Sequence, residues 1–129
     1  MKNKVKLISA SAGFPSPAEN YVEEKLNLNS YLIKNKESSF FVRVSGDSMI
    51  NVGIYNNDIM VVDKSLTPKN QSIVVASLNG ELVVKKFLKD KQGKCYLKSE
   101  NENYPKIILD SKVETTIWGV ATYVIHNLS

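Results

Sequence analysis

The chain has 129 residues, of which 43% are hydrophobic, and this suits one domain with a single core that needs no metal or disulfide. Its only cysteine, Cys95, offers no intramolecular disulfide, which argues against a stapled secreted fold and fits a reducing cytoplasm. The net charge of +4 comes from 17 basic and 13 acidic residues that are interspersed, which favours a soluble, mixed surface.

The N-terminus combines a basic start with a small-x-small pattern at residues 10–12, as a signal peptide would. The stretch 5–8 has only three strongly apolar residues, with Lys6 among them, whereas a secretory core needs about 7–15. No run elsewhere approaches the roughly 18 apolar residues of a membrane span. We therefore expect a soluble, cytoplasmic chain with no membrane partner.

The first residues are predicted to form an exposed arm. Residues 1–15 show no sustained period, and Gly-Phe-Pro-Ser-Pro at 13–17 opposes both helix and strand. A short helix is predicted next, because Ser16 can cap it and Glu19 completes a Ser-x-x-Glu capping box. This helix is predicted to fade near residues 27–29.

From residue 40 onward the pattern is almost entirely β, with runs rich in Val, Ile, Phe and Tyr. The predicted strands are Phe40–Val44, Ile59–Val62, Ile73–Leu78, Leu82–Leu88, Cys95–Leu97, Ile107–Leu109 and Thr116–Ile125. Asn79-Gly80 predicts a hairpin, because a type I′ turn needs positive φ at both central residues. We expect a mainly β chain, with an arm and short helix over 1–38 and a compact, strongly bent β-sheet domain over 39–129.

Residues 45–49, Ser-Gly-Asp-Ser-Met, interrupt the chain after a predicted strand. A serine in a tight turn at a strand end has an exposed Oγ and nearby backbone N–H groups, both of which an acyl-transfer nucleophile needs. Because Ser and Asp are also ordinary turn formers, this motif by itself favours a structural turn.

Lys85 and Lys86 stand inside a predicted strand that is otherwise apolar. Alternation places Lys85 on one face with Val83 and Phe87, and Lys86 on the other. A lysine held among apolar side chains has a lowered pKa and, when neutral, can take a proton from a serine. Alternatively, both stems lie along the sheet and both ammonium groups reach water. Periodicity does not choose between these possibilities.

Other catalytic arrangements are weaker. His126 is the single histidine and lies near the C-terminus, so a Ser-His-Asp triad would depend on one mobile residue. One His and one Cys do not form a ligand set, and we expect no metal or other cofactor. Asp47, Asp58 and Asp63 could pair as acid and base, but each borders a predicted turn or strand end, where Asp is common.

Four stretches taken together resemble the LexA/UmuD family of self-cleaving Ser/Lys peptidases of the S24 type. They are Ala-Gly-Phe-Pro-Ser-Pro-Ala at 12–18, Ser-Gly-Asp-Ser-Met-Ile at 45–50, Gly-Glu through Val-Lys-Lys at 80–86, and Trp-Gly-Val at 118–120. The combination of Gly-Asp-Ser-Met with Val-Lys-Lys is far more specific than either half. The Gly-Phe-Pro-Ser-Pro stretch favours the UmuD branch over the repressors.

The resemblance implies roles for particular residues. Ser48 would be the nucleophile and Lys85 the general base, which leaves Lys86 as a structural or surface lysine. The backbone N–H groups of Ser48 and Met49 would form an oxyanion hole. Self-cleavage would fall between Ala12 and Gly13.

The resemblance also implies a function and partners. The chain would be a homodimeric protein of the SOS response whose cleavage is stimulated by RecA filaments on single-stranded DNA. Its trimmed form would serve a UmuC-like Y-family translesion DNA polymerase. The alternative is a fragment of a LexA-type or phage-type repressor. A repressor should carry an N-terminal helix-turn-helix of about 60 residues, and only 12 precede Gly13, so we expect no sequence-specific DNA binding.

Overall fold

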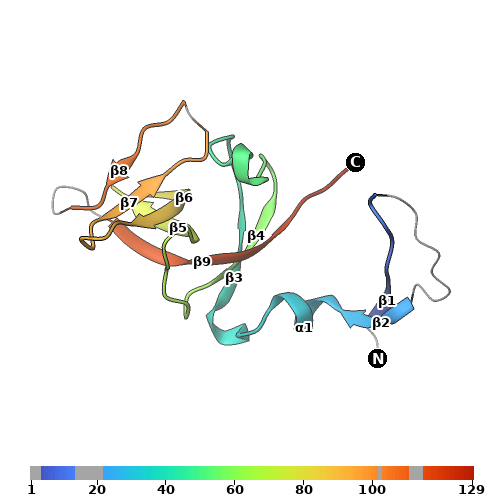
Figure 1. The fold of residues 1–129 in the computed structure, drawn as a ribbon. Coiled ribbons are helices and arrows are strands. Elements are labelled where there is room, and N and C mark those ends of the chain that lie inside the picture. The colour runs from blue at the N-terminus through green and yellow to red at the C-terminus, as the bar shows by residue number, and fades with distance from the viewer. Residues whose placement is uncertain (1–3, 14–21, 102, 111–114) are drawn as a thin grey trace. The chain divides into compact units, whose positions relative to one another are not determined.

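A computed structural model describes residues 4–13, 22–101, 103–110 and 115–129 (Figure 1). The chain divides into two compact units, Met1–Lys34 and Asn35–Ser129. Among the described residues, no helix is long and apolar enough to cross a membrane.

The first unit is built on a two-stranded antiparallel ladder. Strand β1 (Lys4–Ile8) pairs with β2 (Val22–Asn27), and a short helix, α1 (Leu28–Leu32), follows directly. The side chain of Asn27 caps this helix by accepting a hydrogen bond from the Ser30 N–H at 3.3 Å.

This ladder corrects two predictions. Residues 4–8, expected to be irregular, form a strand, and residues 22–27, expected to continue the helix from Ser16, form its partner. The predicted helix start at 16–19 lies outside the described residues. The antiparallel ladder pairs these two segments with each other, so non-local pairing outweighs the local helix signal of the capping box.

The second unit contains one antiparallel sheet of seven strands among the described residues, in the order β3-β4-β9-β5-β6-β7-β8. Its strands are β3 (Ser39–Arg43), β4 (Ile59–Asp63), β5 (Ile73–Leu78), β6 (Glu81–Lys89), β7 (Cys95–Lys98), β8 (Ile107–Ile108) and β9 (Thr115–Ile125). Two short 3-10 helices, η1 (Lys36–Ser38) and η2 (Ile50–Val52), flank β3. All seven predicted strands are confirmed, each end within one residue, and so is the mainly β fold.

The hairpin between β5 and β6 is also confirmed. Leu78 pairs with Glu81, and the two turn residues have positive φ, 50° at Asn79 and 86° at Gly80. Those values are what a type I′ turn requires. The hairpin therefore fixes the register of β6, the strand that carries both candidate lysines.

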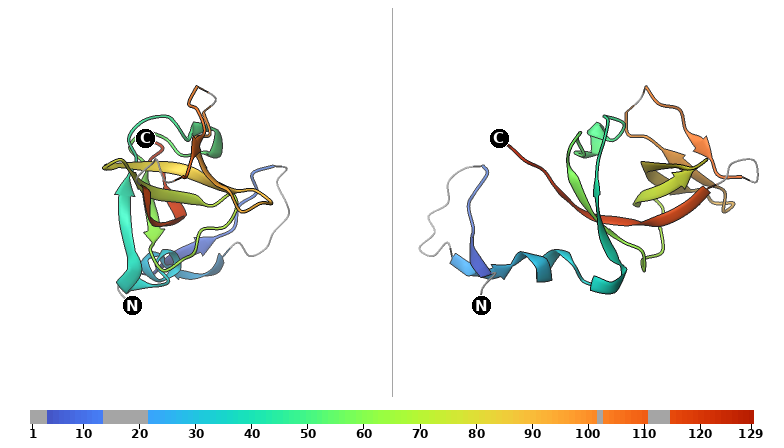
Figure 2. Two further views of the ribbon diagram at one scale, coloured as in Figure 1. Left: turned by 90° about the vertical axis from the view of Figure 1, so that its left-hand side faces the viewer. Right: turned by 180° about the vertical axis from the view of Figure 1, so that it is seen from behind.

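The long strand β9 joins the two halves of the bent sheet, because it pairs with β4 and with β5 (Figures 1 and 2). Irregular pairing occurs on both sides of it, at Val61/Val62 and at Val75/Ala76. Gly119 lies at this crossing, where an added Cβ would come within 2.7 Å of Val62 Cγ1. Close strand approach thus explains the glycine of the Trp-Gly-Val motif.

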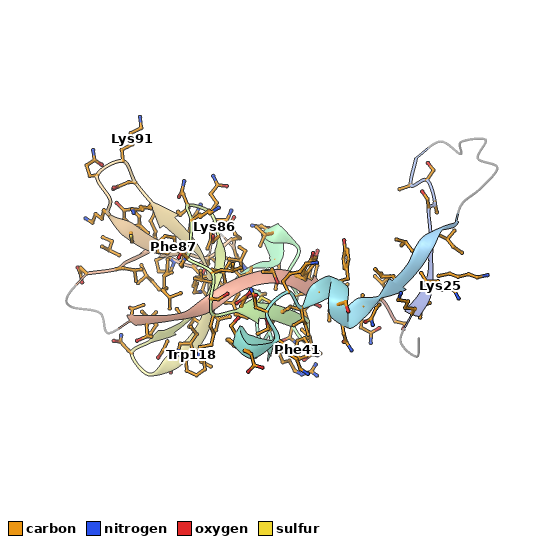
Figure 3. All side chains as sticks on the ribbon, turned by 90° about the horizontal axis from the view of Figure 1, so that it is seen from below. Lys25, Phe41, Lys86, Phe87, Lys91 and Trp118 are labelled. Carbon is orange, nitrogen blue, oxygen red and sulfur yellow. The ribbon has the colours of Figure 1, made fainter. Side chains whose placement is uncertain are left out.

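Alternation along β5 divides the core into two clusters. Val75 belongs to one cluster, with Met49, Met60 and Val62, whereas Val74 belongs to the other. The second cluster also contains Phe87, labelled in Figure 3, and Leu97. Since successive strand residues point to opposite faces, β5 is covered on both sides. A strand buried in this way gives the neighbouring β6 a rigid support.

Candidate active site

Ser48 and Lys85 line the same cavity, which has a volume of about 330 Å³. It lies where the chain leaving β3 approaches the first half of β6. Its apolar wall is formed by Val42, Val44, Val75 and residues 82–84. The structure thus brings together two residues that lie far apart in the sequence, in a pocket of the size that accepts small side chains.

The turn that carries Ser48 is held from both ends. Gly46 has a φ of +99°, a conformation that favours glycine, and its N–H donates to Asn56 Oδ1 at 2.9 Å. Met49 is fully buried in the core and anchors the other side. Ser48, between these fixed points, remains partly exposed. Its Oγ can therefore face the cavity while the backbone stays in place.

Backbone donors are available beside Ser48. Within the described parts of the chain, no backbone carbonyl accepts a hydrogen bond from the N–H of Ser48 or of Met49. Buried N–H groups are usually paired, so two neighbouring donors with no backbone partner among the described residues are notable beside a candidate nucleophile. Two such donors are the arrangement that stabilises an oxyanion.

Lys85 is partly buried and has neutral partners. Its Nζ donates to Ser99 Oγ at 2.6 Å and lies 5.4 Å from the centre of the Tyr104 ring. Burial lowers the pKa of Lys85 below the usual lysine value. In the described residues no carboxylate forms an ion pair with Lys85, and no hydrogen bond joins it to Ser48.

Lys86 has a different environment. Its Nζ forms an ion pair with Glu100 Oε1 at 2.6 Å, and the two side chains keep 19% and 16% of their surface exposed to water. The different partners of the two lysines confirm that strand alternation separates them. Lys86 therefore contacts a carboxylate and is absent from the lining of the cavity that holds Ser48, so it is poorly placed to take a proton from that serine.

Sequence reasoning missed the chain that leaves β7, which contacts both candidate residues. Besides Ser99, the N–H of Glu100 donates to the Ser48 carbonyl at 2.8 Å. Tyr104 Oη donates to Asp47 Oδ1 at 2.9 Å, a contact that raises the pKa of Tyr104. The signal for these residues is the strand register: Lys86 pairs with Lys98, so the next position, Ser99, comes opposite Lys85.

The remaining acidic candidates and the histidine serve the fold. Asp58 is buried, accepts from the Tyr55 N–H and lies 2.5 Å from His126 Nδ1. Burial acts to raise the pKa of Asp58, but the bonds from His126 and Tyr55 lower it overall. None of these groups lines the cavity of Ser48. His126, expected to be mobile, is instead tied to the end of the sheet.

Asp63 is a second buried carboxylate with a structural role. It accepts hydrogen bonds from the side chains of Asn35, Ser38 and Ser65, and these bonds lower its pKa. The network joins η1 to the end of β4. Asp63 is also absent from the cavity lining, so the structure gives it no place in the chemistry of Ser48.

The predicted cleavage site belongs to the first unit. Ala12 and Gly13 are both exposed, and the Gly13 N–H donates to Ser11 Oγ at 3.2 Å. Exposure is what a cleavable peptide bond requires. Cleavage at this bond stays a prediction.

Comparisons with known proteins find relatives that match most of the chain. Protein MucA of Salmonella typhimurium is 42% identical over 114 residues, which cover 88% of this chain and 77% of MucA. Protein SamA of Salmonella typhimurium strain LT2 is 43% identical over 115 residues, which cover 89% of this chain and 79% of SamA. The LexA repressor of Shewanella denitrificans is 38% identical over 118 residues, or 91% of this chain and 57% of the repressor.

These relatives confirm the resemblance to the LexA/UmuD group, and they support a UmuD-like protein of the self-cleaving serine peptidase and SOS mutagenesis kind. A family model described as Peptidase S24-like matches residues 6–122, nearly the whole chain. The chain therefore belongs to the Peptidase S24-like family.

Proposed function

We propose that the chain cleaves its own arm between Ala12 and Gly13, with Ser48 as nucleophile and Lys85 as general base. The observation that carries this proposal is that the two side chains share one cavity, in which burial lowers the pKa of Lys85 and no described carboxylate pairs with it. An unpaired, partly buried lysine is the kind that becomes neutral within an accessible pH range.

The reaction follows ordinary acyl-transfer chemistry. Neutral Lys85 takes the proton of Ser48 Oγ, and the oxygen attacks the carbonyl carbon of Ala12. The N–H groups of Ser48 and Met49 stabilise the oxyanion. The C–N bond then breaks as the lysine returns the proton to the Gly13 nitrogen. Water, activated by the same amine, hydrolyses the acyl-serine and releases residues 1–12.

The biological role we propose is that of a UmuD-like SOS protein. The cytoplasmic, homodimeric chain is cut when a RecA filament on single-stranded DNA favours a closed arrangement of arm and site. Its trimmed form is an accessory subunit of a UmuC-like translesion polymerase. The relatedness to MucA and SamA supports this role. The match to a LexA repressor keeps a repressor fragment as the second candidate.

One experiment tests the chemistry and the stimulating partner together. Purified chain is incubated with RecA, an ATP analogue and single-stranded DNA, and the fragment masses are measured. We expect one cut that leaves Gly13 as the new N-terminus, and none with Ser48→Ala. A stable junction elsewhere would contradict the proposed site. Salt-resistant binding of the uncut chain to one DNA sequence would favour the repressor reading instead.

A further inference from the structure

We propose that Ser99 is a positioning residue for Lys85, whose hydroxyl holds the lysine Nζ in the orientation that serves Ser48. This inference rests on the proposed function, because it assumes that Lys85 is the base. The contact itself is short, with 2.6 Å between Lys85 Nζ and Ser99 Oγ.

Ser99 is placed where a hydroxyl can act as a fixed point. The residue is only 3% exposed, and it directly follows β7 in the register that puts it opposite Lys85. The next residue, Glu100, bonds the Ser48 carbonyl through its N–H at 2.8 Å. One short segment therefore ties the base strand and the nucleophile turn together.

A lysine base needs a hydrogen-bond partner to orient its amine more than other bases do. Its amine ends a flexible four-carbon stem, and in the neutral form it has two N–H groups and one lone pair. If Ser99 Oγ accepts one N–H while the Tyr104 ring covers another side, the lone pair can face the Ser48 hydroxyl. Holding a base in line with its proton is a large part of catalytic power.

The hydroxyl has a second, opposing effect that separates positioning from simple pKa control. A hydrogen-bond acceptor favours the ammonium form, so removing it should lower the pKa of Lys85 further. If Ser99 acted only through the pKa, Ser99→Ala would cleave faster at neutral pH and equally fast on the alkaline plateau. If Ser99 positions the amine, the plateau itself falls.

The test measures RecA-independent self-cleavage against pH for the full chain and its variants. We expect Ser99→Ala to lower the alkaline plateau about 10- to 100-fold, and Ser99→Thr to recover most of it. Ser99→Cys, of similar size but with a weak acceptor, should resemble Ser99→Ala and serves if that variant fails to fold. The matched control is Ser38→Ala, which removes a partly buried 2.7 Å bond to Asp63 and should leave the plateau unchanged.

NMR titration of the Lys85 amine in an uncleavable Ser48→Ala background should show a lower pKa when Ser99→Ala is added.

The cleavage rates of two variants separate failure of this inference from failure of the proposed function. If Lys85→Ala cleaves like the wild type, the proposed function is wrong. If Lys85→Ala is inactive but Ser99→Ala keeps or exceeds the wild-type plateau, only the positioning role is wrong.

Discussion

The two faces of β6 each carry a lysine, at consecutive positions, and the two lysines have different partners. On one face Lys85 contacts the Ser99 hydroxyl and the Tyr104 ring. On the other face Lys86 contacts the Glu100 carboxylate. Ser99 and Glu100 are themselves consecutive, so alternation on the chain leaving β7 matches alternation on β6. The candidate base is thus distinguished by the neutrality of its partners, and two sequential lysines acquire different chemistry.

The largest expected effect comes from exchanging each lysine for alanine. Lys85→Ala should reduce self-cleavage at least about 1,000-fold at every pH, since loss of one member of a catalytic pair removes most of the activity. Lys86→Ala should keep most of it, because its ammonium is engaged by Glu100. The measurement is the cleavage rate of both variants, with circular dichroism to confirm that each is folded. If only Lys86→Ala or only His126→Ala loses cleavage, the assignment of Lys85 as the general base is wrong.

The same two faces should differ in stability one step further along the strand. Phe87 is buried in the second core cluster, whereas Leu88 is only partly buried. Phe87→Ala should lower the free energy of unfolding by about 3–5 kcal/mol, and Leu88→Ala by about 1 kcal/mol. Urea denaturation measures both. Equal losses would mean that β6 has no distinct core-facing side at this position.

A third prediction concerns pH. The neutral amine is the active form, so the cleavage rate should rise about tenfold per pH unit below the pKa of Lys85 and level off above it. Because burial lowers that pKa, the plateau should begin below the ordinary lysine value of about 10.4. The Lys86→Ala profile should overlay the wild type. A profile displaced by that substitution would show that the two faces are coupled.

The smallest effect is expected from the acidic partner of Lys86. Glu100→Gln removes the ion pair but keeps the N–H that bonds the Ser48 carbonyl. Stability should fall by about 1 kcal/mol or less, as is usual for ion pairs that water still reaches. Cleavage should change less than about twofold by this reasoning. A much larger fall in cleavage would make Glu100 part of the catalytic arrangement.

Local pattern was enough to predict the strands, because β-rich runs and turn residues mark each segment of the sheet from residue 40 onward. It also separated Lys85 from Lys86 by face. What it missed depends on pairing between distant segments. Ser99 lies in a run of polar residues that reads as an ordinary loop, and only the β6–β7 register brings it opposite Lys85.

The same limit explains the errors in the first unit. Residues 4–8 and 22–27 acquire their strand conformation by pairing with each other, and the local sequence of neither segment indicates its partner. Tyr104 is a comparable case, since its contact with Asp47 spans 57 positions. Exposed aromatic side chains such as Phe41 and Trp118, labelled in Figure 3, show the converse, because their types alone predict a burial that the fold does not give them.

The bond between the Glu100 N–H and the Ser48 carbonyl also bears on the order in which a growing chain becomes active. The arm and the serine turn leave the ribosome first, and the segment that completes the site follows about 50 residues later. At a synthesis rate of roughly 5–20 residues per second, that interval lasts on the order of seconds. During this time a nascent chain holds its cleavable bond and its nucleophile, but has no organised base beside them. Ribosome-stalled chains that end before residue 99 should accordingly keep their arms intact.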